Sequence, residues 1–593
     1  MFYVGLCYRV GEDEKAGEAF KAALALKGEG KIGDSLLREA TIDDFVAMVK
    51  SDERQRRVLA KAVCKGEIPW VLASFRRQSV FWDWRCRTLN ASVDETVEMR
   101  GDLTVYSTNS FDISRGSGHT LRRIVVPKDA TSVVADISSL ITLSRLKLLE
   151  PFAATFETVF VPESYKAMFV RERQHLLTAQ QSRRRALLSI IGKLESQTIS
   201  VCEDDSVPLV DDGDDGDVPS VLSSADLAGW LYRNGHLSKT DSVQCAKQCH
   251  GKVNPVHIVD STLAAKRIAI DSVTLETIAH TSMLDVALKA FAISITPKCH
   301  STIKGEHQLA EERRSVAEWQ DEVRRCLDRV PNIVWSPWKI PQESESKKGE
   351  LERDDFRLDA FAATLLAQEK CVPLLVDDRW AQANLVFCSN AEQTCAFGTD
   401  ALLNFMYSRG SIGLQQLAGA WSRLLEWRYE FLVPPSEVLL YHAKEYANAP
   451  SDQLRAIVSY MHDSLSDVGL FFGIENSVPP VPMGLNLLIE WMKLTASFCT
   501  AVWNDVEVGE INAKKLVEWA LDHMLPPLPR NMPWQQQHGL SQMVDQLLFQ
   551  LIVFDVGQHG HLKRLRGLLD TMRAVLGISQ QRYVQIIAEV LHV

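Results

Sequence analysis

The middle of the chain, from about residue 131 to 412, alternates short apolar runs with longer amphipathic stretches. The short runs predict buried strands and the amphipathic stretches predict helices, a pattern typical of a parallel α/β sheet. From residue 413 to 593, apolar positions recur with helical spacing, which predicts an all-α C-terminal domain. The expected fold class is therefore multidomain α/β plus α, with helical regions on both sides of the sheet region.

The first 130 residues predict two smaller regions. Residues 1–70 predict helices, and Gly5, Tyr8, Ala16 and Phe20 are spaced as in the second half of a tetratricopeptide repeat. An ordinary amphipathic hairpin explains the same spacing. Residues 75–130 predict a small antiparallel β region, because they contain three runs rich in β-branched and aromatic residues between turn formers. These runs are Val80–Leu89, Asp102–Ser107 and Thr120–Val126.

Two segments of the middle region match each other at a fixed spacing. A shift of 135 residues carries Asp136 onto Asp271, Leu140 onto Leu275, and Phe156 onto Phe291. Both segments predict a buried strand, an aspartate at its carboxyl end, two helices and a second strand. We therefore predict a first α/β unit over residues 131–264 and a second over residues 265–412. The first unit is either degenerate or shares one site with the second.

The aspartates at these predicted strand ends lie where α/β sheets bind their ligands. Further acids occur in the second unit. A helical stretch begins at Asp359, the apolar run Val372–Val376 leads into Asp377 and Asp378, and Asp400 opens another predicted strand-to-helix turn. Asp226 and Asp241 are weaker candidates in the first unit.

The order of these strands, helices and acids over residues 133–412 resembles the PIN-domain nuclease family, with two copies of its first half and one of its second. The resemblance implies a PIN-like core in which three or four carboxylates at strand ends hold Mg²⁺ or Mn²⁺, cations that prefer oxygen ligands. Such metals polarise a phosphodiester and generate hydroxide for its hydrolysis. The implied catalytic residues are Asp136, Asp271, Asp359, Asp377, Asp378 and Asp400, and the implied metal ligands among them are Asp271, Asp359, Asp378 and Asp136.

The chain departs from the family pattern at one place. Many PIN nucleases carry an acid on the helix after the second strand, whereas the positions around Met168 and Ile303 are not acidic, although Glu163 and Glu306 lie nearby. Two functions therefore stay open. One is a metal-dependent nuclease, with RNA as the favoured substrate. The other is a catalytically inactive PIN-like scaffold that binds protein or RNA through its helical regions.

Composition and charge bear on nucleic-acid binding, membrane insertion and the cellular compartment of the protein. The net charge of −11 argues against bulk electrostatic capture of nucleic acid, but the stretch Arg171–Arg185 is either a local basic surface or a solvated helix face. No run approaches the roughly 18 apolar residues that span a bilayer, and the N-terminus lacks the order of a signal peptide. The 12 cysteines show no framework of close spacings. We therefore expect a cytoplasmic protein with reduced thiols and no membrane partner.

Other motifs predict no additional chemistry. The acid-rich residues 202–218 lack the ligand order of an EF-hand and predict a disordered acidic loop, and residues 342–349 predict an exposed linker. Cys245, Cys249, His250 and His257 fit a structural thiol cluster better than a zinc site, since a second paired half is missing. The sequence has no phosphate-binding glycine motif and no Gly-x-Ser-x-Gly, so nucleotide hydrolysis and serine-hydrolase chemistry have no support.

Overall fold

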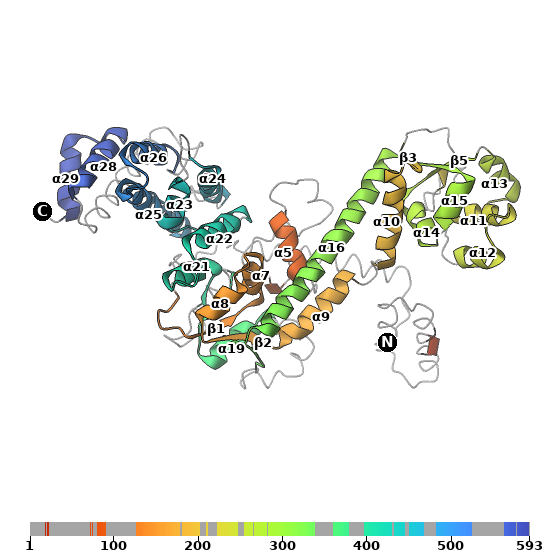
Figure 1. Cartoon of the computed structure of the whole chain (residues 1–593), viewed down its shortest axis with the longest axis horizontal. Coiled ribbons are helices and arrows are strands. Elements are labelled where there is room, and N and C mark those ends of the chain that lie inside the picture. Colours follow the sequence, from red (N-terminus) through yellow and green to blue (C-terminus); the bar gives the residue numbers. More distant parts are fainter. Residues whose placement is uncertain are drawn as a thin grey trace, which may run out of the picture. The chain divides into compact units, whose positions relative to one another are not determined.

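The computed structural model of the chain is mostly helical, with two small sheets of parallel strands (Figure 1). It describes residues 80–89, 126–177, 181–201, 209–210, 222–246, 254–264, 266–281, 283–338, 360–378, 396–427, 429, 432–444, 450–467, 482–524, 562–576 and 578–591, with positions 18, 21, 22, 71, 72 and 74. The chain divides into two compact units. The inserted unit combines Met1–Glu39 with Val170–Asp321, and the flanking unit combines Ala40–Phe169 with Glu322–Val593.

The flanking unit contains a five-stranded sheet in the order β7-β2-β1-β8-β9, with every neighbouring pair parallel. Its strands are β1 (Ser132–Ala135), β2 (Thr158–Pro162), β7 (Ile333–Ser336), β8 (Leu374–Leu375) and β9 (Ala396–Phe397). Helices α7 (Ile137–Arg145), α8 (Leu149–Thr155), α19 (Ala362–Lys370) and α21 (Thr399–Ser408) lie between or after these strands in the chain. The chain order runs outward from β1 in both directions, so the sheet has a topological switch point between β1 and β8.

The inserted unit contains a four-stranded parallel sheet in the order β3-β6-β5-β4. Its strands are β3 (Ile199–Val201), β4 (Leu209–Val210), β5 (Arg267–Ile270) and β6 (Ala292–Ile295). The helices of this unit that precede or join the strands are α10 (Gln181–Glu195), α11 (Ser224–Arg233), α12 (Lys239–Ala246), α13 (Val256–Leu263), α14 (Ser272–His280) and α15 (Met283–Ala290).

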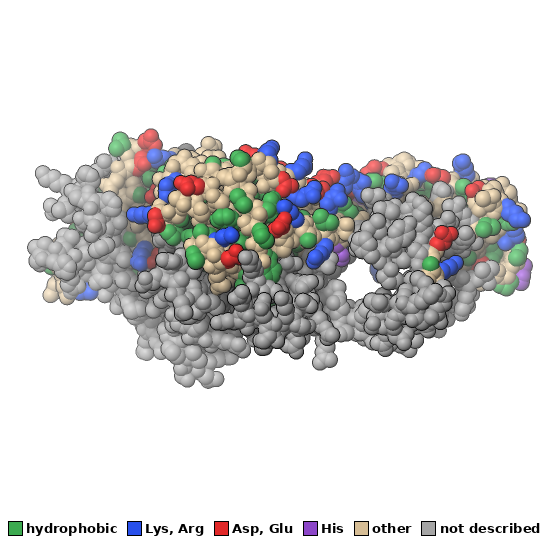
Figure 2. Space-filling model, turned by 90° about the horizontal axis from the view of Figure 1, so that it is seen from below, with side chains coloured by type: hydrophobic (Ala, Val, Ile, Leu, Met, Phe, Trp, Pro, Cys, Tyr) green, Lys and Arg blue, Asp and Glu red, His purple; other side chains and the backbone are tan. Residues whose placement is uncertain are grey.

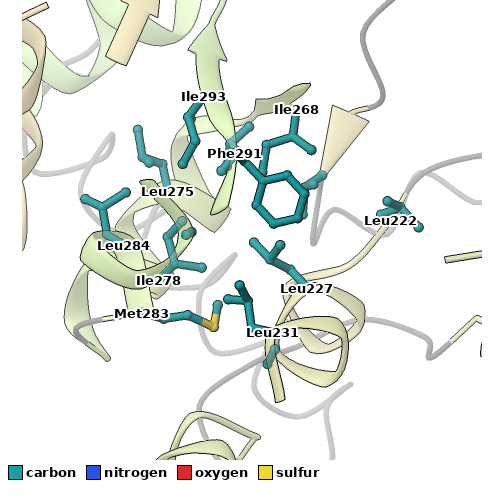
Figure 3. Close-up of a cluster of buried hydrophobic side chains, with 14 of the residues drawn as sticks. Leu222, Leu227, Leu231, Ile268, Leu275, Ile278, Met283, Leu284, Phe291 and Ile293 are labelled. Carbon is teal, nitrogen blue, oxygen red and sulfur yellow. The ribbon is translucent and has the colours of Figure 1, made fainter. Parts of the chain in front are cut away.

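Apolar side chains from helices and strands form the core of this inserted unit (Figure 3). Leu227 and Leu231 of α11 point toward Phe291, Met283 and Ile278, and all five side chains are buried. Their spacing on α11 is one helical turn, so one face of that helix is apolar and is removed from water. Burial of this kind, at about 25 cal/mol per Å² of apolar surface, supplies the main free energy that holds the small sheet to its helices.

Two helices, α9 and α16, cross the division between the units. Helix α9 (Ser164–Leu177) follows β2, and α16 (Pro297–Arg329) follows β6 and leads directly to β7. The division falls between Phe169 and Val170 in α9, and between Asp321 and Glu322 in α16. Both helices therefore belong partly to each unit.

From residue 413 on, every element that the structure describes is a helix. These are α22 (Leu414–Glu426), α23 (Ser436–Lys444), α24 (Asp452–Asp467), α25 (Pro482–Asn504), α26 (Glu510–His523), α28 (Leu562–Val575) and α29 (Gln580–Leu591). Successive helices pack on one another, α22 on α23, α23 on α25, and α25 on α26. Trp421 and Trp491 are buried in this region as core residues. Within the described residues, no helix combines the length and apolar character needed to cross a bilayer.

The structure corrects two predicted elements. The run Val80–Leu89, predicted as a strand, is helix α5. Its buried residues Val80, Phe81 and Trp84 recur at one helical turn, so tertiary packing on one face outweighs the β propensity of its aromatic residues. The predicted acidic loop 202–218 contains β4, a strand too short to give an apolar pattern of its own.

Several other predictions lie outside the described residues. They are the strand run 102–107, residues 120–125 of the third run, the linker 342–349, and nearly all of 1–70, where Glu18, Lys21 and Ala22 are helical. The predicted boundary between residues 264 and 265 does not separate the two sheets. β3 and β4, from the first predicted unit, pair with β5 and β6, from the second.

Candidate carboxylate site

Asp136 lies at the carboxyl end of β1 and is the N-cap of α7. Its Oδ1 accepts hydrogen bonds from the backbone N–H of Ser138 at 2.9 Å and from the Ser138 hydroxyl at 2.6 Å. The hydroxyl of Tyr165, on α9, donates to its Oδ2 at 2.9 Å. The side chain is only 4% exposed. The end of β1, the start of α7 and the hydroxyl of Tyr165 on α9 therefore hold this carboxylate in the interior of the protein.

Asp377 follows β8, the neighbour of β1 across the switch point. Its Oδ1 accepts from the backbone N–H of Thr399 at 2.7 Å, and its Oδ2 accepts from the Thr399 hydroxyl at 3.0 Å. Thr399 is the first residue of α21, so Asp377 satisfies an amide that has no partner within the helix. Asp377 is 5% exposed.

Ser138 joins the two aspartates. Its hydroxyl donates to Asp136 and accepts from the backbone N–H of Asp377 at 3.1 Å. The network continues through Thr142, whose hydroxyl lies 2.6 Å from the hydroxyl of Tyr429, and Tyr429 in turn accepts from the indole N–H of Trp84 at 3.0 Å. The carboxyl ends of β1 and β8 are thus joined by buried hydroxyls to α5 and to the segment after α22.

Burial raises the pKa of Asp136 above its ordinary value, and hydrogen bonds from Ser138 and Tyr165 oppose that rise without cancelling it. Burial also raises the pKa of Asp377. The hydroxyl of Thr142 and the N–H and hydroxyl of Thr399 oppose the rise, while the negative charge of Asp400 adds to it. Both carboxyl groups are therefore held in surroundings that penalise their charged form.

Some of the other aspartates predicted as site residues lie at the five-stranded sheet, and others do not. Asp378 directly follows Asp377 and is 2% exposed, and Asp400 is in the first turn of α21. Asp271 lies at the end of β5 in the other sheet, where it is the N-cap of α14 and accepts from the N–H groups of Val273 and Thr274. Asp359 lies outside the described residues. The structure therefore brings Asp136, Asp377, Asp378 and Asp400 to one sheet and leaves Asp271 in the other.

The donor set at the five-stranded sheet consists of carboxylate and hydroxyl oxygens, which fits a hard cation such as Mg²⁺ or Mn²⁺. Asp136, Asp377, Asp378 and Asp400 are the residues that would hold it. Within the part of the chain that the structure describes, no three His, Cys, Asp or Glu side chains are grouped as in a formed metal site.

The weaker acids of the first predicted unit have structural partners. Asp226 forms a capping box with Ser223 at the start of α11 and accepts from the backbone and side-chain amides of Asn254. Asp241 is not at a strand end but in the first turn of α12, where the Ser238 hydroxyl donates to it. Cys245 is a buried free thiol and His257 is exposed, whereas Cys249 and His250 lie outside the described residues.

Three arginines of the predicted basic stretch form ion pairs within the inserted unit, the first of them Arg173 with Asp321. Arg183 pairs with Glu276 and Glu306, and Arg184 pairs with Glu311. The charge of Glu276 and its hydrogen bond raise the pKa of Arg183. On the face drawn in Figure 2, basic and acidic side chains are interspersed over the described surface. Local pairing therefore neutralises much of the positive charge that the sequence concentrates here.

Sequence reasoning missed the hydroxyl residues that hold the aspartates. The spacing Asp136-x-Ser138 carries a local signal, because an aspartate before a helix accepts from the residues that follow it. Tyr165 and Thr399 are far from Asp136 and Asp377 in the sequence and gave no local signal.

Comparison with known protein families, characterised proteins and solved structures finds no match to this chain.

Proposed function

We propose that this protein is a metal-dependent nuclease that cleaves RNA at the carboxyl end of the five-stranded sheet. The observation that supports the proposal is that the Ser138 hydroxyl donates to the Asp136 carboxylate and accepts from the backbone N–H of Asp377, so that residues following strands on the two sides of the switch point share one partner. Open α/β sheets bind ligands at such a point. Bound Mg²⁺ or Mn²⁺ would supply Lewis-acid polarisation of the phosphodiester and an activated water.

Polar residues around the site would act by holding the carboxylates of Asp136 and Asp377 in fixed orientations. Ser138 and Tyr165 orient Asp136, and Thr399 orients Asp377. All these partners are uncharged donors, which offset only part of the cost of burying two carboxylates. A divalent cation would offset more of it, because it interacts with both negative charges at once.

A second candidate function is a catalytically inactive PIN-like scaffold that binds protein or RNA through its helical regions. It is supported by the fact that both oxygens of Asp136 and both oxygens of Asp377 already accept hydrogen bonds from internal groups. Such a pattern also serves simply to cap α7 and α21. The two candidates differ in whether the site cleaves RNA.

Thermal unfolding of the full chain with and without Mn²⁺ or Mg²⁺ tests the proposal. We expect either cation to raise the melting temperature, since a ligand at 100 times its Kd stabilises the folded state by about 2.7 kcal/mol. Asp377→Asn should remove most of this gain and Asp400→Asn a smaller part. Asp271→Asn, at the corresponding strand end of the other sheet, is the matched control and should keep it.

Cleavage of single-stranded RNA by the same variants separates the two candidates. The nuclease requires that Asp377→Asn loses both the cation-dependent stabilisation and the cleavage. Stabilisation without cleavage in the wild type would leave a cation-binding scaffold. A wild type that shows neither response would reject the nuclease in favour of the inactive scaffold.

A further inference from the structure

The two sheets share one strand order. In the five-stranded sheet the order is β7-β2-β1-β8, and in the other sheet it is β3-β6-β5-β4. In each sheet an aspartate ends the third strand of this order and caps a helix of nine residues, Asp136 before α7 and Asp271 before α14. The predicted equivalence of these two aspartates at strand ends is confirmed.

The register of the ladders is also shared. Val133 pairs with Val159 in one sheet, and Ile268 pairs with Ile293 in the other. On the outer side, Val161 pairs with Trp335 as Ile295 pairs with Val201. On the inner side, Ala135 pairs with Leu375 as Ile270 pairs with Val210. Three independent ladders therefore correspond pair by pair.

The correspondence extends to the last strand and helix. Leu375 pairs with Phe397 of β9, and Val210 forms a parallel bridge with Leu222. Two residues after each of these partners a helix of ten residues begins, α21 at Thr399 and α11 at Ser224. Equivalent core positions are equally buried, with Leu140 and Leu275 both inaccessible to solvent. The match therefore covers strands, helices and core.

Each sheet contains strands from both copies of the repeated sequence. β1 and β2 come from the first copy in the sequence, but their partners β7 and β8 come from the second copy. Conversely, β5 and β6 come from the second copy, and their partners β3 and β4 come from the first. The connection from β2 to β3 has the same length as the connection from β6 to β7. A shift of 134 residues carries Val161 onto Ile295 and also Val201 onto Trp335.

From these observations we infer that the chain contains two copies of one α/β unit that have exchanged their second halves. The five-stranded sheet consists of the first half of the first copy and the second half of the second copy, and the four-stranded sheet is the reciprocal combination. The carboxylate site is consequently composite, because Asp136 and Tyr165 belong to the first copy whereas Asp377 and Thr399 belong to the second.

The length of α16 gives a physical reason for the exchange. This helix has 33 residues and is followed by β7 after a connection of residues 330–332. A helix of that length covers about 50 Å, whereas a four-residue strand covers about 13 Å. A strand that directly follows such a helix cannot return to pair with the strand directly before it. β7 therefore pairs with β2 and not with β6.

Cysteine pairs in the full chain test the exchange. Phe160 pairs with Val334 in the exchanged arrangement. In an unexchanged arrangement of the same register Phe160 would pair with Ser200, because Ser294, its counterpart, pairs with Ser200 here. We expect a short bis-thiol reagent to link Phe160→Cys to Val334→Cys, and peptide mass spectrometry to find at least ten times less linkage between Phe160→Cys and Ser200→Cys.

Ser132→Cys with Thr158→Cys is the positive control, since these residues pair within the first copy in either arrangement. A predominant link between positions 160 and 200 would overturn the exchange. Linkage of the control pair alone, with neither of the other pairs linked, would also count against it. The test does not depend on the nuclease proposal, because strand pairing is measured without a metal or RNA.

Discussion

The carboxyl ends of β1 and β5 hold corresponding aspartates in very different surroundings. Asp136 is 4% exposed and is held by the hydroxyls of Ser138 and Tyr165. The residue that corresponds to Ser138 beside Asp271 is Val273, which is 65% exposed. Asp271 accepts from backbone N–H groups and serves as a helix cap. The same backbone arrangement thus carries a buried polar network in one sheet and a half-buried capping aspartate in the other.

The helix that follows the second strand of each copy, α9 after β2 and α16 after β6, shows the same contrast. Tyr165 corresponds to Cys299, whose thiol lies 3.9 Å from the carbonyl oxygen of Ile270. Burial, together with the negative charge of Asp271, raises the pKa of Cys299 to about 12, so this thiol stays protonated at neutral pH. A hydroxyl that orients an aspartate is therefore replaced by an inert thiol. The two sheets share their strand order, so the neighbouring hydroxyls are what distinguish the Asp136 site from the strand end at Asp271.

Substitutions at the corresponding residues Ser138 and Val273 should differ most in their effect on the free energy of unfolding. Ser138→Ala removes the hydroxyl donor to Asp136, whose Oδ1 still accepts from the backbone N–H of residue 138, and it removes the acceptor for the buried backbone N–H of Asp377. We expect a loss of about 1–3 kcal/mol in the free energy of unfolding. Val273→Ala should change it by less than about 0.5 kcal/mol. Chemical denaturation of both full-length variants measures the difference, and equal losses would contradict the contrast.

A pH dependence should distinguish the buried aspartates in metal-free buffer. The pKa of Asp377 is raised in the folded state above its ordinary value of 3.8, so the folded state binds the proton more tightly than the unfolded state. Its contribution to stability is full below that value and is lost as the pH rises through the folded pKa. The slope reaches at most about 1.4 kcal/mol per pH unit for one group.

Melting temperatures of the wild type and Asp377→Asn across this pH window check the sign. We expect the wild type to lose stability relative to the variant as the pH rises, and Mn²⁺ to reverse the trend, because the cation favours the charged form. A wild type that instead gains stability relative to the variant between acidic and neutral pH, without metal, would contradict the burial of Asp377.

Much of the fold could be predicted from the sequence because its signals are local. Asp136 and Asp271 mark strand ends, and the spacing between Leu140 and Leu275 reveals the duplication. The exchange of halves could not be predicted, because a repeated sequence pattern fits pairing within a copy and pairing between copies equally well. Helix α5 was missed because its buried face is defined by tertiary partners, such as Tyr429 for Trp84.

The candidate site was predicted only in part. Asp136, Asp377, Asp378 and Asp400 follow strands or open a helix, and that position can be seen in an apolar pattern. The separation of Asp271 from them depends on which strands pair, and no local pattern contains that information. The arginines of the stretch 171–185 looked like a basic surface because their acidic partners are distant in the sequence, as with Arg184 and Glu311.

Cleavage of single-stranded RNA in the presence of Mn²⁺, measured for Asp136→Asn and Asp271→Asn in parallel, tests whether the nuclease site lies at the five-stranded sheet. These residues correspond in the two sheets, and each substitution retains the size of the side chain while removing its charge. We expect Asp136→Asn to lower the rate by at least 100-fold with the fold retained, because oriented charge at a reacting phosphate contributes several kcal/mol. Asp271→Asn should stay within about twofold of the wild type. Loss of cleavage in Asp271→Asn with full activity in Asp136→Asn would contradict this placement of the site.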